Sequence, residues 1–292
     1  MSNFQPGILL PVPGHARYLT FALRPGGDPR VALHALRNEV NGRDTVVGIG
    51  ESVVQTLGAR IEGLRGFPQL AGAGIDVPST PSALWLWARG EDRGELLHRS
   101  RRMERALERA FRPQRIVDGF RHQEGRDLTG YVDGTENPKG AKARAAALVK
   151  SGTALAGSSF VAVQQWVHQF DRFEAMTPRQ RDDAVGRRRS DDVELENAPL
   201  SAHVKRTAQE NFEPAAFVVR RSMPWSDAAE SGLMFVAFGA TLDSFEAQLR
   251  RMLGFDDGIA DALFRFTRPV SGAYFWCPPL RRGRLDLSTI GL

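Results

Sequence analysis

Residues 130–138, which read GYVDGTENP, place a single acid between two glycines and join two halves of the chain that share one predicted element order. Glycine adopts backbone conformations that other residues avoid, and Asn-Pro closes the segment as a turn. Tyr131 and Val132 carry the chain inward just before Asp133, whereas an ordinary surface turn is polar throughout. We interpret the segment as a shaped loop that positions a carboxylate. The alternative is a plain Asp-Gly turn after a strand.

The first half alternates strands with helices. Runs rich in β-branched and aromatic residues predict strands over residues 16–24, 45–49, 83–88 and 115–122. Apolar periodicity and the capping pair Asp28-Pro29 predict helices that begin at residue 29 and that span 53–57 and 92–111. Residues 58–80 are predicted to form a loop, since they hold several glycines and prolines.

The second half repeats this order after a long connection over residues 124–157. Its predicted strands span residues 159–167, 217–222 and 233–238, with a last extended pair at 264–266 and 272–277. Its predicted helices span residues 178–185 and 242–253. Two halves with one order predict an α+β fold of duplicated units, each an antiparallel sheet flanked by helices. We place the units at residues 1–145 and 146–292.

Composition limits the classes of function. The net charge is +5, with 39 Lys and Arg against 34 Asp and Glu, and arginine dominates, which suggests an anionic partner. The basic residues are dispersed and no helix-turn-helix pattern is present, so a nucleic-acid partner is not predicted. The one cysteine, Cys277, excludes an internal disulfide and a multi-cysteine metal site. No signal peptide or apolar run of about 20 residues is visible, so we expect a cytoplasmic protein without a membrane partner.

One of the six histidines stands apart. His203 lies in residues 199–207, a segment without strong helix or strand periodicity, where a side chain can point into a cavity. The other five are predicted to be surface or capping residues, His168 among them. No His-Glu-x-x-His spacing indicates a metal site, but a single axial histidine on haem needs no partner histidine.

Taken together, four motifs resemble those of the dye-decolourising peroxidase family, its bacterial B-type members in particular. They are GYVDGTENP at residues 130–138, SAH at 201–203, VRRSMP at 219–224 and GLMF at 232–235. The resemblance covers essentially the full chain. It implies a pair of ferredoxin-like units, similar to a dimeric α+β barrel, with one haem b per chain in the C-terminal unit.

The resemblance also implies roles for single residues. His203 would be the axial ligand of the haem iron, on the proximal side. Asp133 would face the distal side, where it moves a proton between the two oxygens of hydrogen peroxide. Arg220 would lie beside Asp133, keeping it ionised and stabilising negative charge as the O–O bond breaks. Ser222 could hydrogen-bond peroxide or water; related proteins often have asparagine here, so its role is open.

Four further residues would surround the haem. Leu233 and Phe235 would form an apolar distal wall, with core packing as the alternative. Arg187 and Arg206 would pair with the haem propionates, and for Arg187 the alternative is a cation at a helix C-terminus.

The implied reaction is reduction of hydrogen peroxide with one-electron oxidation of dyes, phenolics or other small organic reductants. Radicals on surface aromatic residues could carry the oxidation to bulky donors, although buried packing is the alternative for Trp85, Trp87, Trp166, Trp225, Trp276, Tyr131 and Tyr274. We expect a homo-oligomer. Residues 285–292 weakly resemble the C-terminal targeting segments that direct some family members into encapsulin nanocompartments. The segment is too short and divergent to support an encapsulin partner. The alternatives are a haem-handling protein with incidental peroxidase activity and an arginine-rich nucleic-acid binder.

Overall fold

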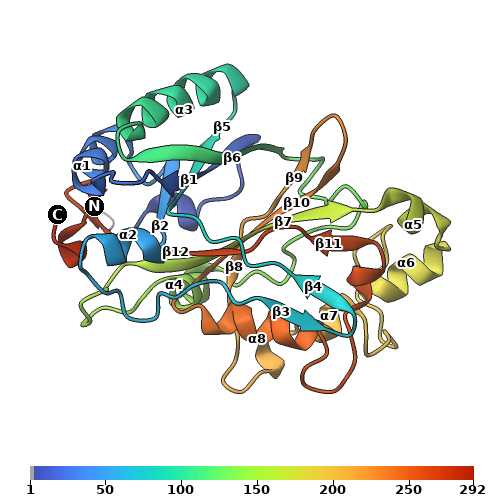
Figure 1. The fold of residues 1–292 in the computed structure, drawn as a ribbon. Helices are drawn as coiled ribbons and strands as arrows, with labels where there is room; N and C mark the ends of the chain where they lie inside the picture. Colours follow the sequence, from blue (N-terminus) through green and yellow to red (C-terminus); the bar gives the residue numbers. More distant parts are fainter. Residues whose placement is uncertain (1–2) are drawn as a thin grey trace.

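Two four-stranded sheets with the same strand order form the centre of the computed structural model, which describes residues 3–292 (Figure 1). In the first half, the order across the sheet is β6 (Phe111–Phe120), β1 (His15–Leu23), β5 (Leu84–Gly90) and β2 (Thr45–Ile49). In the second half, the order is β12 (Ala273–Cys277), β7 (Ser159–His168), β10 (Ser231–Gly239) and β9 (Met223–Ser226). In each half the first strand lies between the third and the fourth, and all pairs are antiparallel. The predicted α+β class and the duplication of ferredoxin-like units are confirmed.

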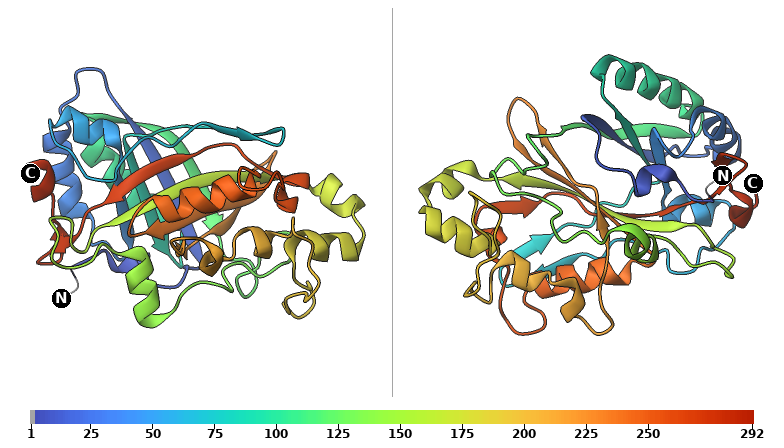
Figure 2. Two further views of the ribbon diagram at one scale, coloured as in Figure 1. Left: turned by 90° about the horizontal axis from the view of Figure 1, so that it is seen from below. Right: turned by 180° about the vertical axis from the view of Figure 1, so that it is seen from behind.

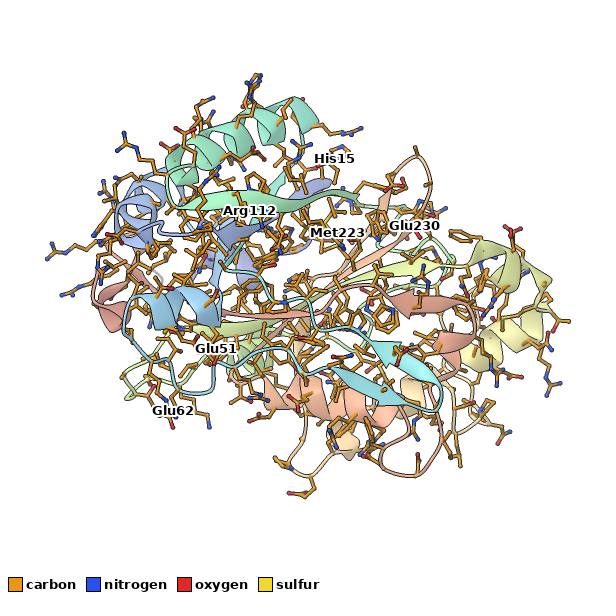
Figure 3. The ribbon with its side chains drawn as sticks, viewed as in Figure 1. His15, Glu51, Glu62, Arg112, Met223 and Glu230 are labelled. Atoms are coloured by element: carbon orange, nitrogen blue, oxygen red, sulfur yellow. The ribbon has the colours of Figure 1, made fainter. Side chains whose placement is uncertain are left out.

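The two sheets join at both edges. β2 pairs with β12 through Ile49 and Trp276, and β6 pairs with β9 through Gly119 and Trp225. Because β7 also pairs with β10, the strands close into a barrel rather than two separate sheets. Closure buries the inward-facing side chains of both halves in one cluster, which includes Tyr18, Trp85, Trp87, Met223, Val236, Phe238 and Phe275. Met223, near the centre of Figure 3, belongs to this interior, whereas Glu230 lies exposed on the β9–β10 hairpin.

Helices cover the outer faces of the barrel. The α1 helix (Pro29–Glu39) and the α3 helix (Arg93–Leu107) pack on the first half, and α8 (Asp243–Met252) packs on the second (Figures 1 and 2). As predicted, Asp28 caps α1 by accepting a hydrogen bond from the Arg30 amide, 3.0 Å away. The remaining helices are α2 (Glu51–Thr56), α4 (Gly140–Ala147), α5 (Phe170–Ala175), α6 (Pro178–Val185) and α7 (His203–Arg206). Short 3-10 helices span Pro6–Ile8, Gln209–Asn211, Ala262–Arg265 and Ser288–Ile290.

Several predicted boundaries are wrong. The third helix ends at Leu107 and β6 already begins at Phe111, because a bulge opposite Thr20 and Phe21 lets the strand include Pro113. The predicted loop over 58–80 contains a hairpin of β3 (Leu70–Gly72) and β4 (Ile75–Val77).

The second half shows similar differences. Of the predicted strand over 217–222 only β8 (Val219–Arg220) forms, and a separate strand, β9, begins at Met223, where the prediction ended; β8 pairs with β10 alone, whereas β9 also reaches β6. The predicted extended segment 264–266 is mostly 3-10 helix, and the strand β11 (Thr267–Pro269) follows it. The predicted unit boundary after residue 145 falls inside α4, a helix that the sequence analysis assigned to a connection. Two short strands, β13 (Leu280–Arg281) and β14 (Arg284–Leu285), form a C-terminal hairpin.

Along β10 the side chains alternate between the barrel interior and the outer face. Met234 and Val236 point inward, whereas Phe235 points outward and its ring lies 5.8 Å from that of Phe245 on α8. The outer face of the second half and α8 therefore enclose a space of their own, outside the barrel. Over residues 3–292, no helix combines the length and the apolar character that crossing a membrane requires.

Candidate functional site

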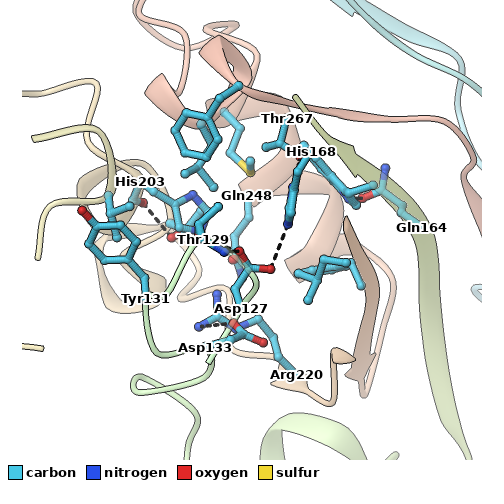
Figure 4. A pocket seen from close by; sticks show the side chains of 18 of the residues that line it. Asp127, Thr129, Tyr131, Asp133, Gln164, His168, His203, Arg220, Gln248 and Thr267 are labelled. Atoms are coloured by element: carbon cyan, nitrogen blue, oxygen red, sulfur yellow. Dashed lines mark hydrogen bonds and ion pairs between the residues drawn. The ribbon is translucent and has the colours of Figure 1, made fainter. Parts of the chain in front are cut away.

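A large, mainly apolar cavity lies between the outer face of the second sheet and the helices α7 and α8 (Figure 4). Its volume is about 940 Å³, including its mouth to solvent. Figure 4 shows His203 on one side of the cavity and Asp133 with Arg220 on another. Leu233 and Phe235 also line it.

His203 begins α7 and is held by a buried acid. Its Nδ1 lies 2.7 Å from Oδ2 of Asp261, whose side chain is fully buried. The other oxygen, Oδ1, accepts the amide of Leu263 at 2.9 Å and so fixes the carboxylate in place. Because a carboxylate only accepts, the proton of the ring sits on Nδ1. In the neutral imidazole this leaves the lone pair on Nε2, which forms no hydrogen bond with any of residues 3–292.

The loop over residues 130–138 has the shaped backbone that its glycines predict. Gly130 and Gly134 have φ angles of 89° and 82°, a left-handed region that favours glycine. The Asp127 amide donates to the Tyr131 carbonyl at 2.8 Å, and the Asp133 amide donates to the Gly125 carbonyl at 3.1 Å. These bonds fold the chain back on itself and present the Asp133 side chain to the cavity. The interpretation as a shaped loop is thus preferred to a plain turn.

Asn137 joins this loop to β8. Its Oδ1 accepts the Arg220 amide at 2.7 Å, and its Nδ2 donates to the Arg220 carbonyl at 3.1 Å. The two residues that sequence analysis paired across 87 positions are thereby brought together, with Nη2 of Arg220 at 3.8 Å from Oδ1 of Asp133. Both side chains are largely buried, at 15% and 25% exposure. An acid and a guanidinium, side by side in an apolar cavity, can move a proton and stabilise negative charge.

A second histidine–carboxylate pair lines the same cavity (Figure 4). His168, at the end of β7, contacts Oδ1 of Asp127 through Nε2 at 2.9 Å and Oγ1 of Thr267 through Nδ1 at 2.8 Å. Asp127 also accepts the amide and the hydroxyl of Thr129, at 2.9 and 2.6 Å. The prediction that His168 is a surface or capping residue is wrong, since its side chain is only 5% exposed.

The charge of Asp127 depends on these partners. Burial acts to raise its pKa, but the hydrogen bonds from His168 and Thr129 outweigh burial and hold the pKa below its usual value. The backbone of Asp127 also holds the start of the 130–138 loop, since its carbonyl accepts the Gly130 amide and its amide donates to the Tyr131 carbonyl, each at 2.8 Å. The pair therefore fixes the loop that presents Asp133 against the end of β7.

We expect His168→Leu to destabilise the fold by about 3–5 kcal/mol at pH 7, because it leaves the buried Asp127 carboxylate without its partner. A depressed folded-state pKa contributes stability that is present above the unfolded-state value of about 3.9 and is lost as the pH falls through the folded-state value. The loss caused by His168→Leu should therefore shrink in acid. Urea unfolding at pH 7 and pH 3.5 measures both. Asp127→Asn in the His168→Leu background should recover part of the loss, and unchanged stability of His168→Leu would contradict the prediction.

Three predicted site residues lie elsewhere. Arg187 bonds to Oε1 of Glu136 at 2.6 Å and to Oε2 of Glu194 at 3.0 Å, just beyond the end of α6. Arg206 is held by both oxygens of Asp257, at 2.7 and 2.8 Å, and its side chain is 5% exposed. Neither arginine lines the large cavity, because carboxylates of the chain itself hold both guanidinium groups. Their pairing with haem propionates stays a prediction, and it would require each guanidinium to exchange or share its present carboxylate partner.

Ser222 lines a second, smaller cavity of about 560 Å³ that borders Asp133 and Arg220. Its hydroxyl accepts the Val236 amide at 3.4 Å, a long bond, and the residue is 8% exposed. It thus adjoins the predicted distal pair from the side of the smaller cavity.

Sequence reasoning missed Asp261, Asp127, Thr129, His168 and Thr267. Asp261 stands alone among apolar residues in IADALF, over 259–264, which is the one local signal that it is buried. The sequence around His168 and Asp127 carries no such signal. His168 ends a strand and Asp127 lies in a polar stretch, and exposed residues are as common as buried ones at such positions.

Comparison with known proteins places this site in a family. The family model described as "Dyp-type peroxidase, C-terminal" matches residues 124–282, more than half of the chain and the part that builds the large cavity. The chain belongs to the Dyp-type peroxidase family. It is therefore a peroxidase.

Relatives of this family match nearly the whole chain. The dye-decolorizing peroxidase of Mycolicibacterium paratuberculosis is 29% identical over 93% of this chain and 82% of its own length. The dye-decolorizing protein from V. cholerae superposes with a TM-score of 0.85 at 31% identity, covering 93% of this chain and 96% of the other. A variant of DypB from Rhodococcus jostii RHA1, solved in complex with heme, superposes with a TM-score of 0.84 at 25% identity, covering 93% of this chain and 94% of the other.

Proposed function

We propose that this Dyp-type peroxidase binds one haem b per chain in the large cavity, with His203 as the axial ligand of the iron. The observation that carries the proposal is the free Nε2 of His203, which belongs to a ring held by Asp261 at the edge of an apolar cavity. The solved heme complex of a DypB variant supports the choice of group. The residues present fit haem, because an apolar cavity suits a porphyrin and a neutral imidazole suits its iron.

Haem, when bound, supplies the redox centre at which hydrogen peroxide is reduced to two waters while two organic donors each lose one electron. The acceptor-only Asp261 holds the proton on Nδ1 of His203 and makes Nε2 the more basic ligand atom. On the distal side, the Asp133 carboxylate takes a proton from one peroxide oxygen and returns it to the other, which leaves as water.

The remaining residues shape that step. The Arg220 guanidinium, 3.8 Å from Asp133, stabilises negative charge on the departing oxygen. Leu233 and Phe235 line the cavity as apolar groups and keep water from the reacting atoms. Ser222 borders the smaller cavity beside the pair, where it can hydrogen-bond peroxide or water as it approaches. Dyes and phenolics are the proposed donors.

Reconstitution with haem tests this function. We expect a Soret band with one haem bound per chain, and turnover of hydrogen peroxide with a phenolic donor at a kcat/KM of at least about 10⁴ M⁻¹ s⁻¹, the low end for enzymes. Absorbance titration and steady-state kinetics measure the two. A Soret band without turnover would instead indicate a haem-handling protein, and no Soret band would contradict the proposed cofactor.

A further inference from the structure

Two arginines lie together inside one end of the barrel. Arg89 is the penultimate residue of β5 and is 7% exposed, and Arg221 follows β8 and is partly buried. Residues 9–12 cross this end and cover both side chains. The positions belong to neither the cavity proposed for haem nor the Asp133–Arg220 pair.

Every hydrogen bond that the two guanidinium groups make is to a neutral backbone carbonyl. Arg89 donates from Nη1 to the Arg43 carbonyl at 3.0 Å and from Nη2 to the Pro11 carbonyl. Arg221 donates from Nη1 to the Arg220 carbonyl at 2.9 Å and from Nη2 to the Leu9 carbonyl at 2.7 Å. The Nε atom of each is buried and has no hydrogen-bond partner within residues 3–292.

No carboxylate neutralises this pair among residues 3–292, where neither arginine takes part in an ion pair. Burial, together with the positive charge of Arg221, lowers the pKa of Arg89 to about 10. Burial also lowers the pKa of Arg221. Asp44 is the one carboxylate that raises the pKa of Arg89 among residues 3–292, and it forms no ion pair with Arg89. Its carboxylate instead accepts a hydrogen bond from the Asn41 side chain at 2.8 Å. Buried charges in proteins are normally paired. The Arg89 guanidinium lies 4.6 Å from the centre of the Trp87 ring, a weaker contact than an ion pair, so a bound anion would stabilise both charges.

An anion can approach the pair from the side of Arg221, because Arg221, but not Arg89, lines an adjoining cavity. Arg221 lines the smaller cavity of about 560 Å³, together with four further basic residues, Arg121, His122, Arg126 and Arg220. The acids on its wall are Asp127 and Asp133, which already contact His168 and Arg220. The balance of charge on this wall is positive, which draws anions toward Arg221.

We propose that Arg89 and Arg221 form a binding site for a small oxyanion, a carboxylate or inorganic phosphate, at this end of the barrel. Guanidinium groups bind such anions through paired N–H donors, and the free Nε of each arginine supplies the missing member of a pair. The site goes beyond the proposed function, because its two binding side chains have no role in the peroxide reaction and it needs no haem, although the cavity beside it also borders Asp133 and Arg220.

Titration of the full-length protein with inorganic phosphate tests the site, with chloride at equal ionic strength as the reference. We expect saturable binding by calorimetry and a rise in Tm beyond that in chloride. In Arg221→Met, the Kd for phosphate should rise about tenfold or more, since a charge-assisted bond is lost, and the phosphate-dependent rise in Tm should disappear. Without phosphate, Arg221→Met should unfold at a Tm no lower than that of the wild type, because a buried like charge is gone.

Two further variants keep the test decisive. Arg112→Met removes the same charge from an exposed position on β6, labelled in Figure 3, and should bind phosphate like the wild type. Arg221→Lys keeps the charge without the planar fork, so it should fold and still bind phosphate more weakly. Equal phosphate binding by Arg221→Lys, Arg221→Met and wild type, or no binding beyond chloride by the wild type, would overturn the proposal. Neither result depends on a Soret band, so failure here is separate from failure of the haem proposal.

Discussion

His203→Ala is expected to abolish axial ligation of haem and, with it, more than about 99% of peroxidase activity. The cavity offers no second imidazole with a free nitrogen, because both ring nitrogens of His168 are hydrogen-bonded, to Asp127 and Thr267. Loss of a metal ligand removes the group that tunes the metal, and outer partners alone change activity by about 10–100-fold. Absorbance spectra in the Soret and visible regions, recorded at equal haem loading, measure the ligation.

A matched control and a rescue separate ligation from folding. His98→Ala removes an exposed histidine on α3 and should leave spectrum and activity unchanged. Added imidazole should restore part of the spectrum in His203→Ala, because the cavity left by the side chain is open to a ligand of the same chemistry. An unchanged spectrum in His203→Ala would contradict the assignment of the ligand.

Replacement of the distal pair is expected to slow the reaction with peroxide while haem binding is retained. Arg220→Leu should lower kcat/KM for hydrogen peroxide by about 10²–10³-fold, the loss typical of one electrostatic group that stabilises developing charge. Asp133→Asn should lower it by about 10²–10⁴-fold, the contribution typical of a proton-transferring group. Stopped-flow mixing with peroxide measures the rate, and the Soret band shows that haem remains bound.

The relative size of the two effects shows which residue contributes more to peroxide cleavage. A larger loss in Asp133→Asn makes this carboxylate the main proton carrier, whereas a larger loss in Arg220→Leu makes charge stabilisation dominant and leaves Asp133 to hold water and tune access. Arg112→Leu, an exposed arginine on β6, serves as the control for loss of charge and should react at the wild-type rate. Wild-type rates in both distal variants would refute the proposed site.

Local patterns predicted most of the architecture. The span of β2 is as predicted, and β7, β10 and α8 are within a few residues of their predicted bounds, because period-2 and helical periodicity carry over directly into buried faces. The hairpin of β3 and β4 and the helices α4 and α5 were missed. These elements are short, and tertiary packing stabilises them more than any periodicity in their sequence.

The candidate site divides in the same way. Asp133, Arg220 and His203 stand in motifs that could be identified in the chain, and the structure brings all three to one cavity. The acids that hold the two buried histidines could not be identified from the sequence. His203 meets Asp261 at a separation of 58 residues, and His168 meets Asp127 at a separation of 41. The acids that hold Arg187 and Arg206 were missed for the same reason, since motif position does not show which carboxylate is nearest; their pairing with haem propionates stays a prediction.

The sequence by itself determined the α+β class, the duplicated element order and the shaped loop at 130–138, since each depends on residue preferences over a few neighbours. Only the tertiary structure decided how the two sheets close into a barrel and which histidine has both ring nitrogens in hydrogen bonds. It alone placed Arg89 and Arg221 together without a carboxylate. Hydrogen bonds and charges act over a few ångströms of space, and distance along the chain carries almost no information about that separation.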